Sequence, residues 1–216
     1  MLAQFAALTS VITSILFLKN RVLFRESPNS ILLIYIVICG ITDLVTGIMG
    51  YFHQSNIQII NLFYFVQFVM LANFLLHYLK RTSLKMVLIA FSILLVVYSI
   101  FDISRHFHEQ KITGQSISIQ ALTLTLLSII LLLKRTFHAD ELLTTDPVFW
   151  FISAILLYSS LSALVFVTSE MCFGNLENIR QFTWSINSFA TIFSNILYLL
   201  GLRCLKTQTK SSLPFM

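Results

Sequence analysis

One carboxylate, Asp43, lies inside a long apolar stretch of the sequence. It is about 13 residues into the stretch that begins near Ser30, or roughly 20 Å along a helix that rises 1.5 Å per residue. An ionisable group at that depth in a bilayer costs a few kcal/mol and usually faces a helix-bundle interior or a wet cavity. Asp43 is therefore either a proton or cation site, the counter-charge of a polar ligand, or a carboxyl that joins two helices by hydrogen bonding. These interpretations stay open.

Amide and hydroxyl side chains recur along two further apolar segments. In residues 57–79 their spacings of 3, 3, 6 and 4 lead us to expect one inward-facing stripe, made of Asn61, Tyr64, Gln67, Asn73 and His77. Residues 182–202 carry a similar set, namely Asn187, Thr191, Ser194, Asn195 and Tyr198. With Asp43 and Thr46 these side chains predict a polar interior. The alternative is that they join helices by hydrogen bonds worth about 0.6 to 2 kcal/mol each, with no ligand involved.

Metal and cofactor chemistry has little support in the sequence. Asp102 and His106 are spaced i, i+4 and are weak candidates for a shared metal ion, but the spacing is not a diagnostic motif and we favour a solvated loop held by polar residues. The three cysteines, Cys39, Cys172 and Cys204, fall at different levels of the predicted helices and are expected to be unpaired. We expect no metal and no cofactor.

Enzymatic motifs are also missing from the sequence. There is no nucleophile elbow, phosphate-binding glycine loop, HExxH or kinase element. Asp146 precedes Pro147 and is interpreted as an N-cap rather than a catalytic group. We therefore expect that the protein is not an enzyme, and any catalysis would have to come from intramembrane residues alone.

The composition places these residues in a membrane. Of 216 residues, 57% are hydrophobic and 11% charged, and the mean hydropathy is +0.86. A soluble domain carries about a quarter charged residues. A disordered chain would be poorer in apolar residues, and a disulfide scaffold would need many more cysteines. The solvent of this chain is therefore largely lipid.

Seven apolar runs are long enough to be membrane spans, since a span takes roughly 20 residues. We predict an all-α seven-transmembrane-helix bundle that forms a single polytopic membrane domain over residues 1–216. The alternative, a β-barrel, would need alternating polar and apolar positions, which runs such as 89–97 lack. The predicted spans are 2–18, 30–52, 57–79, 86–103, 117–133, 148–169 and 182–202.

The basic residues predict an orientation. Of the 14 Lys and Arg residues, 11 fall in connections on one side of the predicted bundle, including Lys80, Arg81 and Lys85. By the positive-inside rule the N-terminus is outside and the C-terminus is cytoplasmic. The basic character then reflects contact with an anionic leaflet rather than nucleic-acid binding.

The spans also allow an internal duplication. Helices 1 to 3 and 5 to 7 would run in the same direction if helix 4 were a linker, giving a possible 3+1+3 parallel repeat. The closest match pairs Asn73 and Arg81 with Asn195 and Arg203, since both spacings are eight residues. The repeat is a prediction for the structure to test.

The chain as a whole resembles a group of small, uncharacterised seven-transmembrane-helix proteins common in Bacteroidota. The resemblance rests on the Phe-, Tyr- and Leu-rich segment from Asn61 to Lys80, on Asp146-Pro147-Val148-Phe149-Trp150-Phe151, and on Gly201-Leu202-Arg203-Cys204. It implies a signalling or sensory role in a bacterial inner membrane, and it supplies no catalytic residue.

These observations predict a membrane sensor that passes an outer-face or intramembrane signal to a separate cytoplasmic signalling partner, facing Lys80, Arg81 and Lys85. The alternative is a small-solute transporter whose polar interior surrounds Asp43. A third interpretation is an intramembrane enzyme or a subunit of a larger complex. The expected partners are the lipid bilayer and that cytoplasmic protein, without nucleic acid.

Overall fold

The computed structural model describes residues 2–25, 28–52, 55–79, 83–106, 112–137, 143–171 and 177–211, with the side chains of 106, 169–171, 177–183 and 210–211 excepted. Within these ranges the chain forms seven α-helices and two short 3-10 helices, η1 and η2, and no strand. All seven α-helices are long and apolar enough to cross a membrane, which confirms the predicted fold class. In chain order the elements are α1 (Leu2–Lys19), η1 (Arg21–Phe24), α2 (Asn29–Tyr51), α3 (Ile57–His77), α4 (Ser83–His106), α5 (Gly114–Phe137), η2 (Leu143–Thr145), α6 (Pro147–Met171) and α7 (Glu177–Ser211).

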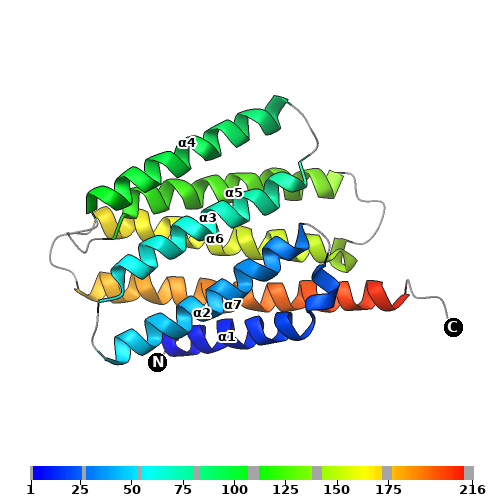
Figure 1. Cartoon of the computed structure of the whole chain (residues 1–216), viewed down its shortest axis with the longest axis horizontal. Helices are drawn as coiled ribbons and strands as arrows, with labels where there is room; N and C mark the ends of the chain where they lie inside the picture. Colours follow the sequence, from blue (N-terminus) through cyan, green and yellow to red (C-terminus); the bar gives the residue numbers. More distant parts are fainter. Residues whose placement is uncertain are drawn as a thin grey trace.

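The helices lie side by side, with the beginning of α1 at one end of the bundle and the end of α7 at the other (Figure 1). We call these two ends the Leu2 end and the Lys19 end, after the two ends of α1. The last helix, α7, has 35 residues and is therefore about 52 Å long, whereas the hydrocarbon core of a bilayer is about 30 Å thick. Its final turns project beyond the other helices at the Lys19 end (Figure 1).

Six of the helices form a closed ring. Going around it, α1 packs on α2, α2 on α3, α3 on α5, α5 on α6, α6 on α7, and α7 on α1. The remaining helix, α4, packs on α3 and α5 at one edge of the bundle (Figure 1). This order agrees with two three-helix groups linked by α4. The proposed match between Asn73 and Asn195 does not hold in the structure, because Asn73 is exposed whereas Asn195 is buried. The duplication therefore stays a prediction.

The interior of the bundle toward the Lys19 end is packed with aromatic rings. The ring centroids of Phe17 and Phe24 are 5.0 Å apart, and Phe151 lies 6.2 Å from Phe17 and 6.4 Å from Phe24. All three side chains are buried. The ring of Tyr198 continues this layer at 6.4 Å from Phe151. We call Phe17, Phe24, Phe151 and Tyr198 the aromatic layer.

An ion pair and a helix cap join two helices at the Lys19 end. The Asp146 carboxylate accepts a hydrogen bond from the backbone N–H of Val148 at 2.9 Å, which confirms that Asp146 caps α6. The same carboxylate forms an ion pair with Arg135 near the end of α5. The Arg135 guanidinium also lies 5.4 Å from the ring centroid of Tyr78, at the end of α3.

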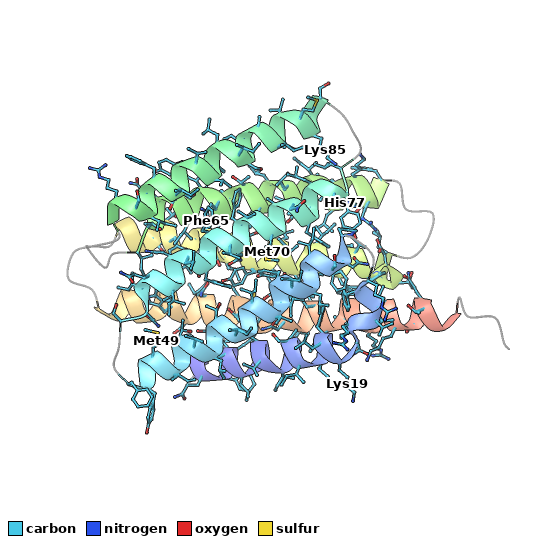
Figure 2. All side chains as sticks on the ribbon, viewed as in Figure 1. Lys19, Met49, Phe65, Met70, His77 and Lys85 are labelled. Atoms are coloured by element: carbon cyan, nitrogen blue, oxygen red, sulfur yellow. The ribbon has the colours of Figure 1, made fainter. Side chains whose placement is uncertain are left out.

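Most of the basic side chains that the structure describes lie at the Lys19 end; Arg105, near the end of α4, is at the Leu2 end. Figure 2 shows Lys19 and Lys85 at the Lys19 end and Met49 at the opposite end. Lys80 and Arg81 lie outside the described residues. Because helix ends alternate between the two sides of the bundle, the Lys19 end also holds Arg21, Arg25, Lys134, Arg135, Arg203 and Lys206.

Candidate functional site

A cavity of about 360 Å³ lies inside the Leu2 half of the bundle. Side chains of α1, α2, α3, α6 and α7 line it. At its outer limit the lining includes Ala3 and Gln4, which are exposed, so the cavity opens at the Leu2 end. Its inner limit is formed by Tyr35, in the first third of α2, and by Tyr198 of α7, and both side chains are buried.

Four of the residues predicted from the sequence to lie in a polar interior line this cavity. They are Asp43 of α2, Tyr64 of α3, and Asn187 and Asn195 of α7. Their predicted companions also lie in the lining, namely Thr46, Thr191, Ser194 and Tyr198. The structure thus brings the carboxylate of α2 together with the polar face of α7.

Two other predicted residues are buried elsewhere. Asn61 accepts a hydrogen bond from the backbone N–H of Thr113 at 3.2 Å, so it holds the start of α5 against α3. Gln67 lies between α3, α5 and α6, beside a second cavity of only about 10 Å³. Asn61 therefore joins helices, as the alternative interpretation proposed.

The prediction that Asn73 faces inward is wrong. Asn73 is exposed, and so is His77 on the same helix, whereas Asn61, Tyr64 and Gln67 are buried. Each residue of an α-helix advances about 100°. The six-residue step from Gln67 to Asn73 therefore turns the side chain by about 240°, away from the stripe that the three-residue steps keep together.

Asp43 lies beside a hydrogen-bonded contact between two other helices. The side chain of Ser10 in α1 lies near the Asp43 carboxylate. The side-chain amide of Asn195 donates to Ser10 Oγ at 3.1 Å and to Thr9 Oγ1 at 3.3 Å. Among the described residues that line the cavity none is Lys, Arg or His, and Asp43 is the one of them that carries a formal charge. The described lining thus contributes one negative charge and no positive charge to balance it.

Aromatic side chains form much of the remaining wall. The hydroxyl oxygens of Tyr64 and Tyr158 are 3.5 Å apart, and Asn187, which accepts a hydrogen bond from Ser162 at 3.2 Å, lies near Tyr64. The rings of Tyr35 and Tyr198 meet edge to face, with their centroids 6.4 Å apart. Tyr64 and Tyr158 also line the second cavity beside Gln67, and they separate the two cavities.

Sequence reasoning missed several lining residues, among them Ser10, Tyr35, Tyr158 and Trp184. Ser10 carried a signal, because it forms a small polar group with Thr13 and Ser14 at the i, i+3 and i+4 positions of α1. Such residues mark a helix-packing face in lipid. Single tyrosines on otherwise apolar helices carry no comparable signal, since tyrosines are also frequent at membrane interfaces.

The candidates for metal binding, Asp102 and His106, are described only in part. Across the ranges that are described, no three His, Cys, Asp or Glu side chains form a group able to hold a metal ion. Asp102 is near the end of α4, and the side chain of His106 is not among the side chains that the structure describes. Cys39 and Cys204 are free thiols, and Cys172 is not among the described residues.

The predicted partner-facing residues are described only in part. The ammonium group of Lys85 donates a hydrogen bond to the backbone carbonyl of Leu79 at 3.1 Å, at the Lys19 end of the bundle (Figure 2). This contact ties the start of α4 to the end of α3. Lys80 and Arg81 stay predictions.

Comparisons of the chain with protein families, with curated proteins and with solved structures found no match. The resemblance to seven-helix proteins of Bacteroidota therefore stays a prediction. What the structure shows is a seven-helix membrane bundle with a polar and aromatic cavity in one half.

Proposed function

We propose that the protein is a membrane sensor that binds a small ligand from the Leu2 end and passes the signal to a separate partner at the Lys19 end. The observation that carries the proposal is the shape of the cavity. It opens at the Leu2 end and ends inside the bundle at Tyr35 and Tyr198. A cavity of this size, lined by a few polar groups and several aromatic rings, is typical of a small-molecule site.

Close packing below the cavity favours binding over passage. Tyr198 contacts the ring of Phe151, and Phe151 packs against both Phe17 and Phe24. A β-carbon on Gly201 would overlap the Phe151 ring, so α7 lies directly against this layer. A solute crossing the membrane would have to separate these rings, whereas a bound ligand would leave them in place.

The cavity is well placed to transmit binding along the helices. Asn195 of α7 hydrogen-bonds to Ser10 of α1, and Asp43 of α2 lies near Ser10, so a ligand at Asp43 that changes these contacts changes how the three helices pack. The other ends of these helices lie at the Lys19 end, where α7 extends beyond the membrane and basic side chains gather. Basic side chains there suit a partner with an acidic surface. In a bacterial inner membrane this partner would lie in the cytoplasm.

A transporter is the second candidate, and Asp43 is the observation that favours it. A single carboxylate in the outer half of a membrane bundle is a typical site for a proton or a coupling cation. The transporter would have to open the aromatic layer during its cycle. The two functions therefore predict opposite results in a flux experiment.

The test combines binding and flux. Purified protein in nanodiscs is screened by thermal unfolding against a panel of small metabolites, and at least one compound is expected to raise the melting temperature. Asp43→Asn is expected to remove the effect, while Asp102→Asn, a carboxylate on α4 away from the cavity, keeps it. The same compound should not accumulate inside proteoliposomes. Accumulation that Asp43→Asn abolishes would contradict the sensor and favour the transporter.

A further inference from the structure

We infer that the ligand of this cavity is a small organic cation, an amine or a quaternary ammonium compound. The inference rests on the proposed ligand-binding function and specifies its chemistry. Three features of the cavity point to this class: its charge, its aromatic wall and the neutral polar groups at its far side.

The described residues of the lining give the cavity one carboxylate and no positive charge. Asp43 lies near Ser10, and none of the described lining residues is Lys, Arg or His. A carboxylate in a low-dielectric site is stabilised by an opposite charge at short range, and a bound cation supplies it. An anionic ligand would meet the Asp43 carboxylate with no basic side chain among the described lining residues to offset the repulsion.

The wall offers ring faces to the same ligand. Six aromatic side chains line the cavity, namely Tyr35, Phe63, Tyr64, Tyr158, Trp184 and Tyr198. An organic cation within about 6 Å of a ring centroid is attracted by the electron-rich face, and aromatic cages are the usual receptors of quaternary ammonium groups. A carboxylate surrounded by aromatic rings therefore suits an organic cation better than a hydrated metal ion.

The rings are held in place before any ligand binds. Tyr64 packs edge to face on Phe166 with centroids 5.0 Å apart and an interplanar angle of 84°. Phe166 packs in the same manner on Trp184, at 6.3 Å and 85°, and Phe63 contacts Tyr64 at 5.6 Å. A preorganised wall loses little conformational freedom when the ligand binds.

Neutral hydrogen-bonding groups line the α7 side of the cavity, and they are Asn187, Ser188, Thr191, Ser194 and Asn195. They suit a hydroxyl, amide or second amine at the other end of the ligand. The volume of about 360 Å³ is near the lower limit for small-molecule sites. The expected ligand is thus compact, with a charged end near Asp43 and a polar end near α7.

The experiment compares cations with neutral compounds of similar shape. Wild-type protein in nanodiscs is titrated with choline against dimethylbutanol, phenylethylamine against phenylethanol, and putrescine against butanediol, with affinity measured by calorimetry. In at least one pair the cation is expected to bind about tenfold more tightly than its neutral partner, as a charge-assisted contact should achieve.

Variants then assign the preference to Asp43. Asp43→Asn keeps the shape of the side chain and is expected to lower the affinity for the cation about tenfold, with less than a twofold change for the neutral partner. Asp43→Glu keeps the charge and should keep the preference for the cation. Asp102→Asn should leave both affinities unchanged. Thermal unfolding of each variant shows whether it is folded.

Two results separate this inference from the proposed function. If no cation binds more tightly than its neutral partner, the ligand class is wrong, and binding of any neutral compound would still support a sensor. If a cation binds and also accumulates inside proteoliposomes, the ligand class stands and the sensor is wrong. If Asp43→Asn retains the full preference for the cation, the assignment to Asp43 is overturned.

Discussion

At Gly40 a β-carbon would overlap the side chain of Ser14, because α1 and α2 approach closely there. Ser14 has little freedom to move, since its hydroxyl donates a hydrogen bond to the backbone carbonyl of Ile36 at 2.7 Å. We expect Gly40→Ala to lower the free energy of unfolding by about 1 to 3 kcal/mol, the usual cost of overpacking. Denaturant titration in detergent micelles measures this change. Gly50→Ala is the matched control on the same helix, because nothing lies within 4 Å of its added methyl; equal losses would contradict the proposed contact.

Gln67 offers a contrasting prediction at a polar residue. Its side chain is 4% exposed, and its Oε1 atom accepts no hydrogen bond from the part of the chain that the structure describes. Removing a buried acceptor that lacks a partner is neutral or stabilising. We expect Gln67→Met to leave the free energy of unfolding unchanged or to raise it by up to about 1 kcal/mol.

The control for Gln67 is Asn61→Leu, on the same face of α3. Asn61 accepts the hydrogen bond of the Thr113 N–H, so this change leaves a buried donor unpaired and should cost about 1 to 3 kcal/mol. Thermal unfolding of both variants in the same detergent provides the comparison. A larger loss in Gln67→Met than in Asn61→Leu would show that the amide of Gln67 has the more important contacts.

Three further polar residues show how much the sequence predicts about single side chains. Asp43 could be predicted to face the interior because a carboxylate in lipid has few other stable positions. Asn73 could not, because an amide near a helix end is tolerated on either side and only the angular step decides its direction. The position of Ser10 near Asp43 was beyond prediction, since it depends on which helix lies beside α2.

At the scale of the helices, Asp146 has two separable roles. It caps α6 through the Val148 N–H and pairs with Arg135 of α5. Asp146→Asn keeps the cap and loses the charge pair, which at this partly exposed position should cost up to about 1 kcal/mol. Asp146→Ala loses both and should cost about 1 to 2 kcal/mol more. Denaturant titration of both variants measures the difference, and equal losses would show that the cap contributes nothing.

The helices themselves were largely predictable. Each of the seven predicted spans corresponds to an α-helix, because a helix is the structure that satisfies the backbone of a single apolar segment in lipid. The end of α7 was predicted too early, at residue 202 instead of Ser211. Hydropathy marks where a chain leaves the membrane, whereas a helix can continue into water when its residues favour it.

At the scale of the whole molecule, the order of the helices around the ring was not predictable. The position of α4 outside the ring and of α1 between α2 and α7 decides which residues share the cavity. Apolar side chains face lipid and interior alike, so hydrophobicity does not show which faces meet. The polar residues of α2 and α7 were sufficient to predict a polar interior, but not its connection through Ser10 or its aromatic wall.

The orientation of the molecule is the prediction on which the direction of signalling depends. The basic side chains at the Lys19 end predict that this end faces the cytoplasm, and the cavity then opens to the outside. In a variant with Cys39, Cys172 and Cys204 replaced by alanine, a single cysteine is introduced as Tyr51→Cys or Lys206→Cys. Both positions are exposed, one at each end of the bundle.

A membrane-impermeant maleimide should label Tyr51→Cys in intact spheroplasts of a bacterial host and Lys206→Cys only after permeabilisation. A permeant maleimide, which labels both, shows that each thiol is reactive. The reverse pattern would place the cavity on the cytoplasmic side. A ligand would then have to be an intracellular compound, and the partner at the Lys19 end would have to lie outside the cell. Because that end holds most of the basic residues, the reverse orientation would also contradict the positive-inside rule. The labelling experiment therefore tests both the orientation and the direction of signalling.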